Sequence, residues 1–233
     1  MREALAHPDR PVREVFATAA ALVRHRDLRL EAERTGIVVT VVDDRVLAQL
    51  SDSVSPQGLV AVVAVLAADL STVLKTDARL VVVLADVRDP GNAGSVIRVA
   101  DAAGADAVVL TRGSVDPWGG KAVRASAGSV FHLPVITGLE TGEVVRVLQK
   151  AGLAVLAADG GGALGLDAAD EQGLLAQRTA WLFGNEAWGL PPEIARLADQ
   201  VVAVPIHGRA ESLNLATAAA VCLYASAGAQ RKA

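Results

Sequence analysis

The sequence predicts an α/β protein in which a small α/β domain precedes a larger domain with a mostly parallel sheet and helices on both faces. From residue 79 onward, short apolar runs alternate with helical segments, the order expected for a parallel sheet. Residues 80–84 read Leu-Val-Val-Val-Leu, as in a strand that is buried on both faces. Hydrophobic residues make up 52% of the 233 residues and aromatic residues only 3%, which predicts an aliphatic core.

The first part of the chain is predicted to contain short elements of both kinds. Its apolar spacing favours two helices and two strands. The helices are expected over residues 11–21 and 44–50, and the strands over 36–42 and 58–66.

A more polar connector over residues 67–78 marks the predicted domain boundary. We therefore assign residues 1–70 to the small domain and residues 79–233 to the larger one.

The larger domain is predicted to repeat a strand, a loop and a helix along its length. Glycines at positions 104 and 152 end two of its helices. The predicted strands span residues 80–84, 107–110, 130–135, 153–158, 181–183 and 201–205, and the predicted helices span 93–103, 120–126, 140–151 and 213–227.

Hydropathy and cysteine content argue against a membrane-spanning, secreted or disulfide-bonded protein. The longest apolar run, residues 59–68, is shorter than the ~18 residues that a membrane span needs, and the N-terminus has no signal-peptide core. Cys222 is the only cysteine, so no intrachain disulfide forms and we expect no metal site. These features predict a cytoplasmic protein that does not bind membranes.

The formal net charge is −4, which gives no global sign of nucleic-acid binding. The first 30 residues nevertheless carry more arginines than carboxylates. This local excess is compatible with RNA contact and equally with a solvated helix face.

Three segments at strand ends carry unusual polar residues. The first, residues 86–98, follows the strand over 80–84, at the sheet edge where ligands bind in parallel sheets. Asn92 lies where it could cap the following helix, and Arg98 lies about two turns further on. The spacing alone does not show whether Arg98 has a function or is simply an exposed or salt-bridged residue on the helix surface.

The second segment, residues 182–193, places Glu186 and Trp188 between Gly184 and Gly189, just after a strand. The glycines allow a sharp turn or a close approach to a ligand. Trp188 could stack on RNA or pack within its loop.

The third segment, residues 204–215, ends a strand at Pro205 and opens a helix near Ser212. Ser212 would be an ordinary N-cap. Asn214 is less ordinary in a first helical turn, because asparagine is a poor helix former.

Together the three segments resemble the motifs of the SpoU family of RNA ribose 2′-O-methyltransferases, in the SPOUT class. The likeness covers residues 80–228, and residues 1–66 more weakly resemble the ribosomal-protein-like substrate-binding domain that often precedes it. That domain usually opens with a further strand, so the likeness suggests a truncated N-terminus. The matching residues are Pro90, Gly91, Asn92, Gly94, Arg98, Ala100 and Gly104; Phe183 to Glu186 with Gly189 and Leu190; and Pro205 with Ser212, Leu213 and Asn214.

The resemblance implies a C-terminal trefoil knot, a homodimer and S-adenosyl-L-methionine as cofactor. It implies that main-chain groups of Gly184, Val204 and Leu213 contact the cofactor, with the segment Leu156, Ala157 and Ala158 close by. Members of the family act on ribosomal or on transfer RNA, so a tRNA ribose methyltransferase stays an alternative; the additional N-terminal domain is commoner in the ribosomal branch and favours ribosomal RNA.

The resemblance also implies catalytic roles. In the family the motif arginine, here Arg98, is sometimes assigned as the base, but a guanidinium is very hard to deprotonate. We therefore expect Arg98 to hold a phosphate and to stabilise the developing alkoxide. Asn92 would orient Arg98 or the ribose, and Glu186 would fix that network. Ser212 and Asn214 would hold the knot loops and the substrate hydroxyl.

Two other functions fit these residues less well. A catalytically silent RNA-binding protein on the same scaffold would not need Asn92, Arg98, Glu186, Ser212 and Asn214 together. A nucleotide-dependent oxidoreductase is disfavoured, because no Gly-x-Gly-x-x-Gly motif follows the first strand of the larger domain.

Overall fold

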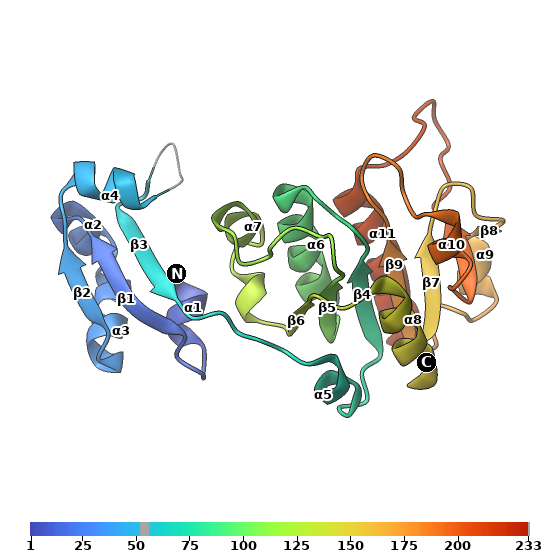
Figure 1. Ribbon diagram of the computed structural model, residues 1–233, viewed down its shortest axis with the longest axis horizontal. Coiled ribbons are helices and arrows are strands. Elements are labelled where there is room, and N and C mark those ends of the chain that lie inside the picture. The colour runs from blue at the N-terminus through green and yellow to red at the C-terminus, as the bar shows by residue number, and fades with distance from the viewer. Residues whose placement is uncertain (52–55, 233) are drawn as a thin grey trace. The chain divides into compact units, whose positions relative to one another are not determined.

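A computed structural model describes residues 1–51 and 56–232 (Figure 1). The chain divides into two compact units, Met1–Leu66 and Ala67–Ala233. The division falls at the start of the connector expected over residues 67–78.

Within its described residues, the smaller unit contains a three-stranded sheet in the order β2-β1-β3. Strand β1 runs parallel to β2 and antiparallel to β3. The strands predicted near β2 and β3 and the helix predicted at α4 are confirmed. The elements are α1 (Arg2–Ala6), β1 (Val12–Ala17), α2 (Ala19–Arg24), α3 (Arg26–Thr35), β2 (Val38–Val41), α4 (Asp44–Leu50) and β3 (Leu59–Val63).

The helix predicted over residues 11–21 is wrong, because most of that segment is strand β1. Val12 and Val15 are both buried, and their separation of three residues suggests a helix. The pairing of β1 with β3 shifts register between Val12 and Glu14, and this irregularity places both valines on one face of the strand. The helix α2 starts only after Thr18, whose side chain caps it.

Among the described residues, the larger unit contains a seven-stranded sheet in the order β6-β5-β4-β9-β7-β10-β8. Each pair of neighbouring strands is parallel, as predicted. The trefoil knot stays a prediction. The strands are β4 (Leu80–Leu84), β5 (Ala107–Leu110), β6 (Val135–Thr137), β7 (Ala154–Ala158), β8 (Leu164–Gly165), β9 (Thr179–Phe183) and β10 (Gln200–Ala203).

The helices of the larger unit cover both faces of this sheet. The predicted helices near α6, α7, α8 and α11 are confirmed, whereas α5, α9 and α10 were not predicted. They are α5 (Leu70–Leu74), α6 (Pro90–Ala103), α7 (Gly120–Ala125), α8 (Thr141–Lys150), α9 (Leu166–Glu171), α10 (Pro192–Ala195) and α11 (Leu215–Gln230), with a 3₁₀ turn η1 at Ser129–Phe131.

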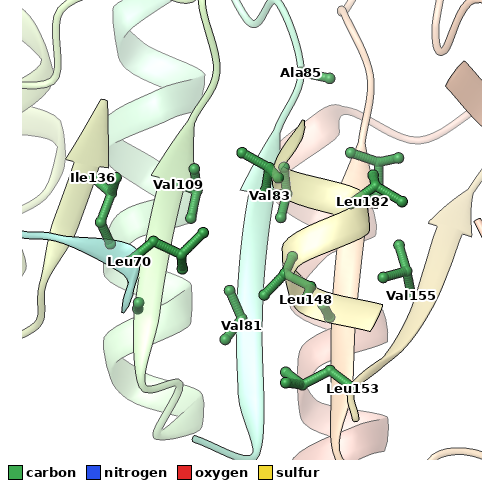
Figure 2. Close-up of a cluster of buried hydrophobic side chains, with 14 of the residues drawn as sticks. Leu70, Val81, Val83, Ala85, Val109, Ile136, Leu148, Leu153, Val155 and Leu182 are labelled. Atoms are coloured by element: carbon green, nitrogen blue, oxygen red, sulfur yellow. The ribbon is translucent and has the colours of Figure 1, made fainter. Parts of the chain in front are cut away.

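One face of the sheet forms an aliphatic core with α5 and α8. Val81 and Val83 of β4 lie in it beside Leu148 of α8, and Leu70 of α5 belongs to the same buried cluster (Figure 2). The connector expected to be polar therefore contains a helix that packs on the core.

The opposite face packs against α6 and α11. Trp181 of β9 is fully buried there and donates a hydrogen bond from its indole nitrogen to Ser226 of α11, at 2.8 Å. Cys222 is also fully buried on α11, and this burial raises the pKa of its thiol to about 12. The thiol therefore stays protonated at neutral pH and serves as a core side chain.

The strand predicted over residues 130–135 is largely wrong. Residues 129–131 form the turn η1, and β6 begins only at Val135. Pro134 has no N–H to donate to a neighbouring strand, so it precedes the strand and contributes only its carbonyl, which accepts a bond from Val108.

None of the helices in the described parts of the chain is both long and apolar enough to cross a bilayer.

Candidate active site

A cavity of about 300 Å³ lies at the carboxyl ends of β9, β7 and β10. These strands are neighbours and end at nearly the same level, since Ala158, the last residue of β7, pairs with Phe183 of β9 and with Val202 of β10. The cavity therefore lies where parallel sheets bind ligands. Its lining residues are Ala158, Asp159, Gly160, Phe183, Gly184, Asn185, Glu186, Ala187, Gly189, Val204, Ile206, Glu211, Ser212, Leu213, Leu215 and Ala218.

The loop after β9 forms one wall of the cavity and is tightly closed. The backbones of Asn185 and Gly189 exchange two hydrogen bonds, at 3.0 and 2.9 Å. A Cβ on Gly184 would lie 2.3 Å from the carbonyl carbon of Gly189, so only glycine fits at this position.

Asn185 fixes that loop to the end of β4. Its side chain is buried; the Nδ2 atom donates to the carbonyl of Asp86 at 2.6 Å, and the Oδ1 atom accepts from the N–H of Ala187. Asp86 has a left-handed backbone, with φ of 53°, and Asn185 therefore stabilises an uncommon conformation next to the cavity. Asn185 was not among the predicted site residues.

Glu186 joins the same loop to the start of α6. Its carboxylate accepts hydrogen bonds from the backbone N–H groups of Arg88 and Asp89, at 3.3 and 3.2 Å. It also accepts one from the side-chain nitrogen of Asn92, at 3.2 Å. A carboxylate suits this position because it lies at the N-terminal end of α6, where the helix dipole places partial positive charge.

Asn214 completes a chain of side chains that links all three predicted segments. Its Nδ2 atom donates to the Oδ1 atom of Asn92 at 3.0 Å, and Asn92 in turn donates to Glu186. The structure thus brings together Asn92, Glu186 and Asn214, which lie far apart in the sequence. Both polar ends of the Asn92 amide are engaged, so its orientation is fixed.

Asn92 does not cap helix α6, the structural alternative to a role in the site. Helix α6 begins earlier, with Asp89 as N-cap and Pro90 in the first turn, and Asp89 accepts the N–H of Asn92 at 2.7 Å. That hydrogen bond, and then an ion pair with Lys121, hold the pKa of the Asp89 carboxyl below its usual value. The side chain of Asn92 is therefore free of capping and can bind Glu186 and Asn214.

The predicted cap of the last helix is also wrong. Asn214, rather than Ser212, caps α11, since its Oδ1 atom accepts the N–H of Ala216 at 2.9 Å. Both residues are good caps, and only Asn214 gains a second bond, to Asn92. Ser212 instead lines the cavity with an exposed side chain, which makes no hydrogen bond within the described residues.

Arg98 lies outside this arrangement. It is an exposed residue of α6 that does not line the cavity, and no ion pair or hydrogen bond engages its side chain in the described parts of the chain. Its proposed catalytic role therefore rests on the motif alone.

The predicted cofactor-binding residues divide into two groups. Gly184, Val204, Leu213 and Ala158 line the cavity. Leu156 and Ala157 do not, because they are fully buried within β7.

Two carboxylates at the cavity, Asp159 and Glu211, were not predicted. Asp159 directly follows β7, so its place at a strand end could have indicated it. Together with Glu186 they give the lining three acidic residues and no lysine or arginine. The cavity therefore favours a ligand that carries positive charge.

Comparisons with known proteins agree with this architecture. The model of the SpoU rRNA methylase family matches residues 79–224. This chain belongs to the SpoU family. The model of the RNA 2′-O ribose methyltransferase substrate-binding domain matches residues 1–67 of the same SpoU chain.

The similarity to known proteins extends over most of this SpoU chain. The 23S rRNA (guanosine(2553)-2′-O)-methyltransferase RlmP of Bacillus subtilis is 36% identical over 190 residues, 82% of this chain and 73% of RlmP. The 23S rRNA (guanosine-2′-O-)-methyltransferase RlmB of Bordetella pertussis is 30% identical, over 95% of this chain and 91% of RlmB. The crystal structure of the SpoU methyltransferase AviRb of Streptomyces viridochromogenes with AdoMet has 30% identity and a TM-score of 0.78, and covers 100% of this chain and 88% of AviRb.

Proposed function

We propose that this SpoU protein transfers a methyl group from S-adenosyl-L-methionine to a ribose 2′-hydroxyl of ribosomal RNA. The observation that carries the proposal is the cavity at the ends of β9, β7 and β10, connected to the network of Asn92, Glu186 and Asn214. The relatives RlmP and RlmB are 23S rRNA 2′-O-methyltransferases by name, which favours ribosomal over transfer RNA.

The cavity fits this cofactor in size and charge. Its volume of about 300 Å³ lies at the lower end of small-molecule sites, and main-chain groups and small side chains form much of its wall. S-adenosyl-L-methionine carries a positively charged sulfonium, which suits a lining with Asp159, Glu186 and Glu211 and no basic side chain. We assign Gly184, Val204 and Leu213 as the main-chain contacts.

The bound cofactor supplies an activated methyl group, so the protein needs mainly to position the 2′-hydroxyl. Ser212 lines the cavity with a hydroxyl that can hydrogen-bond the ribose. Asn92 is held in one orientation by Glu186 and Asn214, which makes it a rigid support at the cavity edge. Arg98, as a permanent cation, would bind the adjacent phosphate and stabilise the developing alkoxide, while that phosphate or water accepts the proton of the 2′-hydroxyl.

Two measurements test the function directly. Calorimetry should detect binding of S-adenosyl-L-methionine and none of NAD, and labelled methyl groups should appear in an unmodified 23S rRNA transcript. Cofactor binding without transfer to any RNA would instead favour the catalytically silent alternative. Transfer to tRNA but not to the 23S transcript would replace the proposed substrate.

We propose that the smaller unit supplies RNA affinity through exposed arginines. Some of its arginines are paired within the unit, as in Arg2 with Asp27 and Arg34 with Glu31. Arg24 and Arg26 are exposed and make no ion pair among the described residues, so they are available for phosphates.

Changing Arg24 and Arg26 together to Gln should weaken RNA binding and reduce the slope of log affinity against log salt by about 1 to 2, because two phosphate contacts no longer release counterions. Filter binding of the 23S transcript at several salt concentrations measures both effects. The double change of Arg2 and Arg34 to Gln removes the same charge and should alter the slope less. Equal slopes in the two variants would contradict the assignment.

We propose a homodimer, as the family resemblance implies, but the apolar face of α11 is not free to form its interface. The apolar residues Ala219, Cys222 and Leu223 of α11 are buried within their own chain. The exposed side of α11 instead presents Val221 and Tyr224, which are 39% and 56% exposed and lie about one turn apart. This side is our candidate interface.

Light scattering should give a mass near twice 23.9 kDa at micromolar concentration. Val221→Glu should shift it toward the mass of one chain without unfolding the protein, because the side chain is exposed and a buried interfacial charge is costly. A single-chain mass for the unmodified protein would exclude the dimer.

A further inference from the structure

Trp188 is an exposed aromatic residue in the loop that closes the proposed active site. Its side chain is 54% exposed, whereas Trp181 is fully buried and Trp118 packs on Phe131 with ring centroids 6.2 Å apart. An exposed indole offers a large flat surface for a binding partner, and tryptophan is enriched at interfaces for this reason.

The backbone that carries Trp188 is held rigidly. It lies between Asn185 and Gly189, whose backbones are paired, and Asn185 is bonded to Asp86 on the loop after β4. The indole is therefore presented from a fixed position, and little loop ordering would oppose binding to it.

Arg88 supports one side of the indole. The carbon at the centre of its guanidinium lies 5.1 Å from the centre of the Trp188 ring. Two hydrogen bonds to the carboxylate of Asp86, at 3.0 and 3.1 Å, hold the guanidinium in place. The N–H of Arg88 donates to Glu186, so this arrangement is contiguous with the Asn92 network.

The other side of the indole has no aromatic partner in the described parts of the chain. Its surroundings are charged, since Arg88, Asp86, Asp89 and Glu186 lie in the same cluster of contacts. An isolated aromatic face among charged groups does not form the apolar patch that a protein partner would need. It suits a nucleobase, which offers a flat π-face beside polar groups.

We propose that the open face of Trp188 stacks on an unpaired base of the RNA substrate, next to the ribose that is methylated, with Arg88 holding the indole from behind. Trp188 is thus a positioning residue. The proposal rests on the proposed function for its location in the reaction, whereas the stacking itself can be tested without methyl transfer.

Binding of a six-nucleotide oligoadenylate to the full-length protein isolates the stacking. The oligonucleotide should quench tryptophan fluorescence, because a base would cover Trp188. Trp188→Ala should weaken this binding on the order of 10- to 100-fold, and Trp188→Phe should restore most of it, because aromatic stacking tolerates exchange of the ring. Fluorescence anisotropy of a labelled oligonucleotide measures affinity in variants that lack the indole.

Trp118→Phe is the matched control, since it removes another incompletely buried indole and keeps a ring against Phe131. It should retain both the quenching and the affinity. The proposal is overturned if oligoadenylate fails to bind the unmodified protein, if Trp188→Ala binds it normally, or if quenching is lost in Trp118→Phe and kept in Trp188→Phe.

Steady-state kinetics on the 23S transcript separate positioning from a general structural effect. Trp188→Ala should raise the KM for RNA by at least 10-fold, leave the Kd for S-adenosyl-L-methionine unchanged and recover with Phe. Loss of cofactor binding in Trp188→Ala would assign Trp188 to loop packing. A lower mass by light scattering together with normal oligoadenylate affinity would assign it to a protein interface. Absence of methyl transfer by the unmodified protein would contradict the proposed function, while the oligoadenylate result would still decide the stacking.

Discussion

Arg98→Ala should lower the rate of methyl transfer about 100- to 1000-fold while cofactor binding stays unchanged. The loss is expected because one donor to the developing alkoxide disappears. Cofactor binding should persist because Arg98 does not line the cavity. Stability should persist as well, since the side chain is exposed and unpaired in the described residues. Single-turnover rates, cofactor calorimetry and thermal melting measure the three quantities.

Arg98→Lys tests whether charge alone is sufficient. Lysine keeps the positive charge but lacks the planar pair of donors, so we expect it to restore RNA binding and little of the rate. Arg146→Ala is the control, because Arg146 is another exposed helical arginine, on α8 at the opposite face of the sheet. Near-normal turnover by Arg98→Lys would show that charge is enough. Loss of cofactor binding in Arg98→Ala would show a structural role and contradict our reading of the site.

Gly184→Ala should abolish cofactor binding and destabilise the protein. The added Cβ would lie 2.3 to 2.5 Å from three backbone atoms of Gly189 and Leu190, which cannot move without opening the loop over residues 185–189. Overpacking of this kind typically costs about 1–3 kcal/mol or more. Calorimetry with the cofactor and chemical denaturation report the two effects.

Gly160→Ala is the matched control for Gly184→Ala. Gly160 lines the same cavity, but a Cβ there would meet no protein atom within 4 Å. We expect its free energy of unfolding to match that of the unmodified protein. If Gly184→Ala were as stable as Gly160→Ala and bound the cofactor, the close contact would not determine the shape of the cavity.

The fold was predictable from the sequence wherever hydrophobic burial alone decides the structure. The run over Leu80–Leu84 is buried at every position and forms a strand with the predicted bounds. The prediction failed where backbone details decide. The register shift in β1 gives a strand helical spacing, and Pro134 delays the start of β6. Short elements such as β8 (Leu164–Gly165) depend on pairing with β10, which local sequence does not reveal.

The candidate site was predictable as three loops but not as a network. Parallel topology explains why the loops meet at one sheet edge. The bond between Asn92 and Asn214, however, depends on which residue caps each helix, and the sequence offers good caps at Asp89 and Asn92 and again at Ser212 and Asn214. Asn185 was missed because its role is to hold the carbonyl of Asp86, a contact between distant segments.

The position of the transferred methyl group tests the central proposal most directly. The modified nucleotide is first mapped in an unmodified 23S rRNA fragment after incubation with labelled S-adenosyl-L-methionine, and the same fragment is then made with a 2′-deoxynucleotide at that position. We predict a 2′-O-methyl ribose in the first RNA and no transfer to that nucleotide in the second. Continued methylation of the 2′-deoxy RNA at this nucleotide would show that a base is the acceptor and would contradict the proposed function.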